Sequence, residues 1–283
     1  MLKEVKLRIM KKGELSNKRS QITIFIIIAV LLVVAVSIVF LVRSSMKTGG
    51  ETTPAGTENV GDFVTNCLKI TAENGLIIIG RQGGYYQVSS PSILYSGNDS
   101  APEQKYFTEF SNINVPYYLY GSSIANMPST QTIENQISLY VQENLDNCLN
   151  DFSLFKQKGF DVTKGTIAAS TRILDDKVIA SLDYPVTATK GDIVQTKTAY
   201  NVDVPVRLGL IYNLTNNMIL NHTACPPVTN PPNLNNDCSR IIRSNDFNIA
   251  FIRLDNTALL IFTDNKYKLN NNYYDWIFAY QYA

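Results

Sequence analysis

The apolar run ITIFIIIAVLLVVAVSIVFLV, residues 22–42, decides how this chain of 283 residues is organised. It contains no charged residue, and only Thr23 and Ser37 interrupt its apolar character. At about 1.5 Å of rise per residue, a helix of this length just crosses a hydrocarbon core of about 30 Å. A surface helix of a globular domain would carry a polar face, which this run lacks. The sequence therefore predicts one transmembrane helix over Ile22–Val42.

The charges on either side of the run predict its orientation. Lys and Arg are concentrated before it, at Lys3, Lys6, Arg8, Lys11, Lys12, Lys18 and Arg19. Because short Lys/Arg-rich segments stay in the cytoplasm, we expect residues 1–21 to be a cytoplasmic basic segment. Residues 43–58 are expected to be a linker, and residues 59–283 one extracytoplasmic domain. The alternative is a cleaved signal peptide, but its apolar region would be shorter, and Arg43–Met46 is a poor cleavage site.

The composition argues against nucleic-acid binding and fits an exported domain. The formal net charge is +1 and 17% of the residues are charged, so we expect no basic surface for phosphates. Three Asn-x-Ser/Thr sequons are candidate glycosylation sites on surface loops, at Asn98, Asn213 and Asn221.

The chain has four cysteines, and outside the cytoplasm an even number favours two disulfides. Cys225 and Cys238 bracket a proline-rich loop, and a disulfide there would contribute about 3 kcal/mol in the chain-entropy model. Cys67 and Cys148 each lie on an apolar helical stripe, so they are placed to join two packed helices. The alternative for this pair is two buried free thiols. Since no C-x-x-C pair occurs and His222 is the only histidine, we expect no metal and no cofactor.

Apolar residues at three- and four-residue spacings predict two helices after the linker. The first begins at Asn59 and continues to about Gly80. The second follows the capping candidates Ser129 and Thr130 and ends at Gly159. Each helix has one apolar stripe, and we expect the two stripes to pack against each other.

From residue 166 the apolar period changes to two. The segments 166–173, 178–189 and 194–204 are expected to form an antiparallel meander that covers one face of the helix pair. Pro185 belongs to the outward-facing set, which indicates either an edge strand or a bulge.

The remaining segments complete an α+β fold class. A third helix is expected within 206–220, and short strands or an ordered layer of rings within 85–127. Turn signals at Asp264-Asn265 and at 270–272 separate further strands, expected at 247–254, 258–263 and 273–280. The last of these strands should carry a row of aromatic rings on one face.

Motifs that would identify an enzyme are missing from the sequence. There is no G-x-S-x-G, no H-E-x-x-H, no P-loop and no G-x-G-x-x-G. His222 lies in a sequon beside the proline-rich loop, where we interpret it as a solvated loop residue. We therefore expect no catalytic residues. A glycosidase with two carboxylates stays open as an alternative, because its acids need no fixed spacing in the chain.

The segment Gly83–Tyr86 directly follows the first helix. Its two glycines permit a tight reversal or the close approach of another backbone, with the rings packed over it. The alternative is an aromatic contact surface for a sugar or a partner protein, formed by Tyr85, Tyr86, Tyr117, Tyr118 and Tyr120.

The segment KRSQITIF, residues 18–25, resembles the class III signal of archaeal type IV pilin-like proteins. The resemblance implies cleavage by a prepilin peptidase between Ser20 and Gln21, followed by packing of the apolar helix into a filament core. The chain has Ser20 where these signals usually carry Gly, and Phe25 where such pilins commonly carry Glu. Much of the remainder resembles uncharacterised single-span archaeal surface proteins, in the cysteine-bearing first helix that runs into residues 81–86 and in the segments 140–155 and 184–186. That second resemblance implies a location but no activity.

These observations favour a non-enzymatic, membrane-anchored surface protein with a role in envelope structure or cell contact. The expected partners are the membrane and envelope proteins or glycans, with self-association through Ile22–Val42 and no nucleic acid. One alternative is a pilin-like filament subunit processed between Ser20 and Gln21. A second alternative is an anchored enzyme that acts on envelope glycans or peptides.

Overall fold

The structure is a computed structural model, and it describes residues 59–95, 112–121, 123–220 and 247–281. The chain divides into two units, Met1–Thr57 and Glu58–Ala283, and the described elements all belong to the second. Among the described residues, no helix has both the length and the apolar character needed to cross a membrane. Several predicted features lie outside the described residues, namely the transmembrane helix, the linker, Ser20, Gln21, Asn98, Asn221, His222, Cys225 and Cys238.

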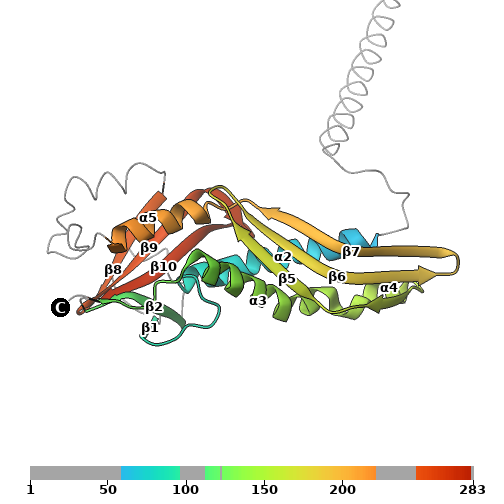
Figure 1. Cartoon of the computed structure of the whole chain (residues 1–283), viewed down its shortest axis with the longest axis horizontal. Helices are drawn as coiled ribbons and strands as arrows, with labels where there is room; N and C mark the ends of the chain where they lie inside the picture. The colour runs from blue at the N-terminus through green and yellow to red at the C-terminus, as the bar shows by residue number, and fades with distance from the viewer. Residues whose placement is uncertain (1–58, 96–111, 122, 221–246, 282–283) are drawn as a thin grey trace, which may run out of the picture. The chain divides into compact units, whose positions relative to one another are not determined.

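The first two predicted helices are confirmed, as α2 at Val60–Arg81 and α3 at Thr130–Leu149. Asn59 and Ser129 are their N-caps, and each side-chain oxygen accepts a hydrogen bond from a backbone N–H of the first turn. The two helices lie side by side against the strands (Figure 1). Their apolar stripes are buried in one core.

Helix α3 ends ten residues earlier than the predicted end at Gly159, so this part of the prediction is wrong. Asn150, Asp151 and Phe152 all have left-handed φ angles, of 45°, 49° and 53°. Three consecutive non-glycine residues in this region are rare, and they turn the chain away from the helix axis. A short helix, α4 at Ser153–Gln157, follows the 3₁₀ turn η2 at Asn150–Phe152.

The predicted meander is confirmed as part of a four-stranded antiparallel sheet. Its central strand β6 pairs with β7 on one side and with β5 and β4 in succession on the other. The strands are β4 at Asp161–Lys164, β5 at Ala168–Ile173, β6 at Val178–Lys190 and β7 at Ile193–Val204. Strand β4 was not predicted, because its four residues show no alternation of apolar and polar side chains.

Pro185 marks a bulge inside β6, and the edge-strand interpretation is wrong. The register of β6 against β7 shifts between Asp183 and Val186, which leaves one extra residue on β6. Proline has no N–H to give to the ladder, so it fits where the pairing is interrupted. Its carbonyl oxygen is still used and accepts a hydrogen bond from Gly165 N at 2.8 Å.

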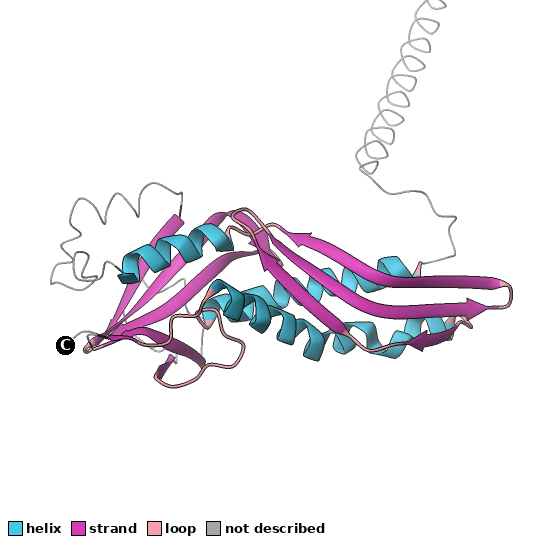
Figure 2. Ribbon diagram, viewed as in Figure 1, coloured by secondary structure: helices cyan, strands magenta, loops and turns pink. Residues whose placement is uncertain are grey.

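The third predicted helix is confirmed as α5 at Leu208–Leu220, and the remaining strands form a second sheet. The order of this sheet is β1-β2-β10-β9-β8, with β3 paired to β2. The strands are β1 at Ser92–Tyr95, β2 at Ile113–Tyr120, β3 at Ser123–Ile124, β8 at Phe247–Leu254, β9 at Thr257–Leu269 and β10 at Asn272–Gln281. Figure 2 shows the helices and strands of both sheets.

The second sheet is mixed, whereas an antiparallel sheet was expected. Strands β2 and β10 pair in parallel, and the other pairs are antiparallel. A parallel pair needs a crossover connection, and here the helix α3, the meander and α5 all intervene in the chain. The structure thus confirms the α+β class, with three main helices, one antiparallel sheet and one mixed sheet.

Strand β9 runs through the turn predicted at Asp264-Asn265, so that prediction is wrong. The register of β9 against β10 jumps between Asp264 and Lys268, which leaves three residues in a bulge. Lys266 N donates a hydrogen bond to Asp264 Oδ1 at 2.9 Å. This side-chain to backbone hydrogen bond is the one by which Asp stabilises turns, and here it stabilises the bulge. The predicted turn at 270–272 is confirmed, with left-handed φ angles at Asn270 and Asn271.

Strand β10 separates two apolar clusters. Its aromatic residues Tyr274, Trp276 and Phe278 face the larger cluster, which includes side chains of the helices and of both sheets. Ile277 and Ala279 face a smaller cluster on the other side of the mixed sheet. The predicted row of rings on one face of this strand is therefore confirmed.

Candidate functional site: the polar end of the helix pair

A polar hollow opens at the C-terminal end of α3. It has a volume of about 460 Å³ and is lined by Asp146, Asn147, Asn150, Asp151 and Lys164. Carboxylate, amide and ammonium groups converge here, which makes the hollow the candidate site to evaluate.

The local fold brings these side chains together. Asp146 and Asn147 belong to the last turn of α3, and the left-handed turn places Asn150 and Asp151 next to them. Strand β4 contributes Lys164 from its last position. The C-terminal end of a helix carries partial negative charge, so a lysine is favourably placed beside it.

Lysines neutralise both carboxylates of the hollow. Lys164 Nζ lies 3.4 Å from Asp146 Oδ1 and 3.6 Å from Asp151 Oδ1. Lys156 Nζ lies 2.5 Å from Asp151 Oδ2. The hydrogen bond from Lys156 and its charge hold the pKa of the Asp151 carboxyl below its ordinary value, and Lys164 adds to this effect.

Both acids of the hollow are paired with lysine, and the pKa of one of them is lowered. A two-carboxylate hydrolase needs one carboxyl group with a raised pKa that can protonate the leaving group. The pKa of Asp151 is shifted in the opposite direction, and Lys164 contacts both acids. Within the described ranges, no group of three or more His, Cys, Asp or Glu side chains is arranged to hold a metal ion.

Tyr184 of β6 is a buried tyrosine whose pKa is affected by Asp146 and Asp151 of this network. The residue is 1% exposed, and its hydroxyl has no hydrogen-bond partner within the described part of the chain. Burial raises the pKa of Tyr184 to about 12, with contributions from Asp146, Tyr200 and Asp151. The phenol therefore stays protonated at neutral pH and serves packing.

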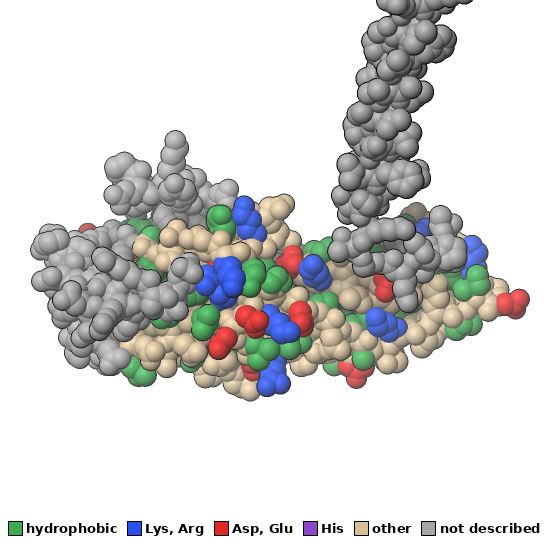
Figure 3. Space-filling view, turned by 90° about the horizontal axis from the view of Figure 1, so that it is seen from above, with side chains coloured by type: hydrophobic (Ala, Val, Ile, Leu, Met, Phe, Trp, Pro, Cys, Tyr) green, Lys and Arg blue, Asp and Glu red, His purple; other side chains and the backbone are tan. Residues whose placement is uncertain are grey.

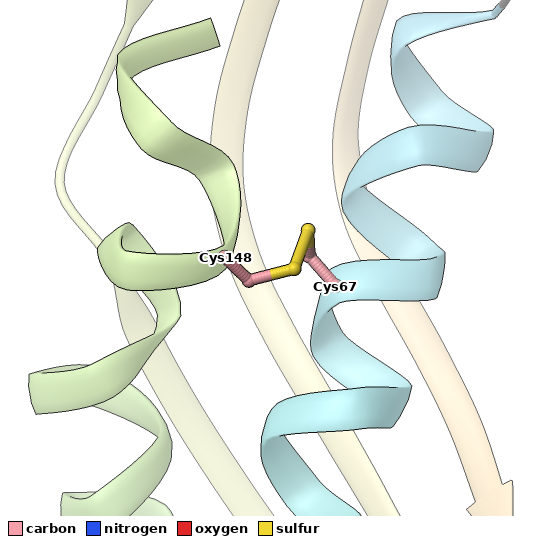
Figure 4. Close-up of a disulfide and its surroundings, with 2 residues drawn as sticks. All are labelled: Cys67 and Cys148. Carbon is pink, nitrogen blue, oxygen red and sulfur yellow. A yellow bond between two sulfur atoms is a disulfide. The ribbon is translucent and has the colours of Figure 1, made fainter.

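Cys67 and Cys148 form a disulfide, which confirms the predicted bridge between the two helices. The Cα atoms are 5.6 Å apart, and 81 positions separate the two residues in the sequence. Figure 4 shows the bridge crossing from α2 to α3. It lies two residues before the left-handed turn, so it fixes the end of α3 that carries the hollow. The predicted bridge between Cys225 and Cys238 lies outside the described residues.

Gly83 and Gly84 allow other parts of the chain to approach the backbone closely, as predicted for a glycine pair directly after the first helix. Both have positive φ angles, of 53° and 86°. A Cβ atom on Gly83 would lie 2.9 Å from the carbonyl oxygen of Ile277, and one on Gly84 would lie 2.8 Å from Pro128 Cγ. No larger residue fits these positions without displacing a neighbour.

Three of the tyrosines considered for an aromatic contact surface pack close to this glycine pair. Tyr118 is 0% exposed, stacks on Phe278 with a centroid distance of 4.4 Å, and donates a hydrogen bond to Gly83 O. The rings of Tyr86 and Tyr140 meet edge to face at 5.0 Å. Tyr85 donates a hydrogen bond from its hydroxyl to a backbone carbonyl oxygen at 3.3 Å. The rings of Tyr118 and Tyr86 are thus engaged in packing, and the hydroxyl of Tyr85 is engaged in a hydrogen bond.

The two other tyrosines lie on the opposite face of the mixed sheet. Tyr117 is 8% exposed, and its hydroxyl lies 3.1 Å from Thr257 Oγ1. Tyr120 is 47% exposed and packs edge to face on Tyr117 at 5.2 Å. The structure therefore does not bring the five tyrosines to one surface, and Tyr120 is the one whose ring is largely open to solvent.

Asn213 is exposed on α5, not on a loop. Thr215 of the same sequon is 0% exposed, and its hydroxyl is buried. The three residues of this sequon are therefore not all accessible in the folded domain.

Arg207 and Asp264 form a buried ion pair that was not predicted. Asp264 is 0% and Arg207 6% exposed, and Arg207 Nε lies 3.1 Å from both carboxylate oxygens. The guanidinium also lies 4.2 Å from the centroid of the Phe247 ring. The apolar run Leu259–Phe262 ends two residues before Asp264 and indicated a buried segment, but Arg207 lies 57 residues away in the sequence.

The charged side chains on one face of the domain are mixed in sign. In Figure 3, Lys and Arg side chains are interspersed with Asp and Glu over the face shown, without a field of one sign. Comparison with protein-family models, with curated proteins and with solved structures found no match for this chain.

Proposed function

We propose that this chain is a non-enzymatic, membrane-anchored surface protein that serves envelope structure or cell contact. The observation that carries the proposal is the disulfide between Cys67 and Cys148, which indicates an extracytoplasmic domain. The Lys/Arg bias before Ile22–Val42 independently predicts the same side of the membrane.

The chemistry of the described surface supports a role without catalysis. The polar hollow is an ion network of Asp146, Asp151, Lys156 and Lys164, whose charges compensate one another. The network also joins the end of α3 to α4 and β4. Its properties are those of a structural clamp next to the disulfide.

Protease treatment of intact cells tests the proposal. If the domain faces outward, an added protease should release a fragment that starts between residues 43 and 58 and contains the Cys67–Cys148 bridge. Full protection of the chain in intact cells, with digestion after lysis, would rule the proposal out.

A filament subunit is the second candidate, and the residues 18–25 favour it. N-terminal sequencing of the mature protein separates the two candidates. A mature chain that starts at Gln21 supports the filament subunit, whereas a chain that starts at Met1 or Leu2 supports the anchored protein.

A further inference from the structure

The tip of the β6–β7 hairpin presents two neighbouring apolar side chains to solvent. Ile193 is 45% and Val194 is 62% exposed. Among the described residues, they are the only large exposed hydrophobic residues that are adjacent in the sequence. Neither belongs to an apolar cluster of the domain, so both side chains are available for a contact outside it.

The tip is held in place by its surroundings. The hydroxyl oxygens of Thr187 and Thr196 lie 3.1 Å apart across the two strands. Lys190 Nζ donates a hydrogen bond to Lys158 O at 2.7 Å and lies 5.6 Å from the centroid of the Phe160 ring. The apolar pair is therefore presented by a well-supported hairpin.

The chain enters the domain beside this hairpin. Val60, the first residue of α2, donates its backbone N–H to Gln195 Oε1 at 2.9 Å, and Gln195 directly follows Val194. The side chain of Lys197 covers Gly61, where a Cβ atom would lie 2.6 Å from Lys197 Cδ. In Figure 1 the hairpin extends beyond the first turn of α2.

The sequence limits how far this entry point lies from the predicted membrane segment. Sixteen residues, 43–58, separate the apolar run from Asn59, and they reach at most about 55 Å when fully extended. A short linker thus joins the apolar run to the start of α2, which contacts the hairpin that carries Ile193 and Val194.

We propose that the β6–β7 tip contacts the surface of the lipid bilayer in which the chain is anchored, with Ile193 and Val194 at the boundary of headgroups and acyl chains. This inference rests on the proposed anchoring. Two apolar side chains bind a bilayer weakly on their own. The covalent link to an anchor supplies a high effective concentration, so a contact too weak for a free domain becomes populated.

The charges around the tip determine whether the contact depends on anionic lipid headgroups. Lys158 and Lys190 are balanced by Asp161 and Asp192, and all four residues are exposed. Because this end carries no net charge, the contact depends on apolar insertion and not on anionic lipid. It should therefore be insensitive to salt.

Photo-crosslinking of the full chain in proteoliposomes tests this contact. A photoreactive p-benzoylphenylalanine replaces Val194, and the matched control carries it at Asn201, an exposed residue of the same strand. At 3.3 Å per residue the control position lies about 23 Å further along β7. The vesicles consist of phosphatidylcholine, with or without phosphatidylglycerol, and the readout is the mass of the crosslinked product.

We expect at least fivefold more lipid adduct from position 194 than from position 201, with and without phosphatidylglycerol and at low and high salt. Equal adduct at both positions would overturn the inference, as would a crosslink from position 194 to a second copy of the chain. Failure of the chain to stay with the vesicles would instead contradict the proposed anchoring, so the two failures are distinguishable.

Discussion

The junction of the two sheets depends on the side chain of Asp264. Its carboxylate binds the guanidinium of Arg207, which precedes α5, and accepts the N–H of Lys266 in the bulge of β9. A carboxylate that is fully removed from water is tolerated only when its oxygens are satisfied in this way.

Removal of this carboxylate should strongly destabilise the domain. Asp264→Ala removes the buried carboxylate that binds the Arg207 guanidinium and Lys266 N, and we expect the free energy of unfolding to fall by about 3–5 kcal/mol. Chemical denaturation followed by circular dichroism measures the change. The control is Lys177→Ala, which breaks the exposed pair with Asp203 and should have no measurable effect. Equal effects of the two substitutions would contradict this account of Asp264.

Gly84 has crowded surroundings and Gly121 has open ones. Substitution of each residue therefore distinguishes the cost of a strained backbone from the cost of steric overlap. Gly84 has φ +86° and lies against Pro128 and Trp276, whereas Gly121 has φ +61°, and no described residue outside its chain neighbours lies within 4 Å of an added Cβ. Gly121→Ala should cost about 1–2 kcal/mol through its backbone conformation alone. Gly84→Ala should cost roughly 2–5 kcal/mol, because overlap adds to the strain. A thermal or urea melt of both variants checks the difference, and a smaller loss for Gly84→Ala would refute the close approach.

Two tyrosines should make the domain sensitive to alkaline pH. Burial raises the pKa of Tyr184 and of Tyr200 to about 12, from an ordinary value near 10. A raised pKa means that the folded state holds the phenol proton more tightly, so stability is fully present below pH 10 and is lost as the pH rises towards 12. Unfolding free energies measured between pH 9 and 12 should fall by about 1–3 kcal/mol for each tyrosine.

Phenylalanine variants assign this loss to its sources. Tyr184→Phe removes a buried hydroxyl that has no hydrogen-bond partner among the described residues, so it should keep or raise stability at pH 7 and weaken the alkaline loss. Tyr200→Phe should cost about 1 kcal/mol at pH 7, because the Tyr200 hydroxyl donates a hydrogen bond to Lys197 O. An unchanged alkaline profile in both variants would exclude these two residues as its cause.

At the scale of elements, the disulfide organises the helix pair. Cys67 lies in the second turn of α2 and Cys148 in the last turn of α3, directly before the left-handed turn. The bridge closes a long loop, because the two residues are separated by 81 in the sequence. In the chain-entropy model such a loop is worth about 4–5 kcal/mol.

Single cysteine substitutions test this contribution. Cys67→Ala or Cys148→Ala should each lower the free energy of unfolding by about 4–5 kcal/mol, and the double variant should lose little more. Urea denaturation of the three variants measures the losses. Losses that simply add would show that the two thiols stabilise the domain independently, contrary to a bridge.

The elements that the sequence predicts well are those with a sustained period. The stripes of α2 and α3, the alternation in β6 and the row of rings in β10 each repeat over many residues, because one face of each element is buried. The disulfide followed from the same patterns, since both cysteines lie on helical stripes.

The features that escaped prediction depend on contacts between distant residues. The stripe of α3 continues in register to Phe152, so periodicity alone does not reveal the left-handed turn at Asn150. The parallel pairing of β2 with β10 and the ion pair of Asp264 with Arg207 have no local signature. The polar hollow was not predicted either, because Lys164, one of the residues that line it, belongs to the short strand β4, which was itself not predicted.

At the scale of the whole molecule, the account depends on which side of the membrane the domain occupies. The disulfide and the charge bias around Ile22–Val42 are both consistent with an outward domain on a single anchor. The proposed bilayer contact at Ile193 and Val194 also requires this arrangement.

Lysine labelling of intact cells with a membrane-impermeant reagent tests this topology most directly. Exposed lysines of the domain, such as Lys158 and Lys190, should carry the label, whereas Lys3, Lys6 and Lys12 should carry it only after the cells are permeabilised. Mass spectrometry of the peptides identifies the labelled positions. Label on the N-terminal lysines of intact cells, with the domain unlabelled until permeabilisation, would contradict the account.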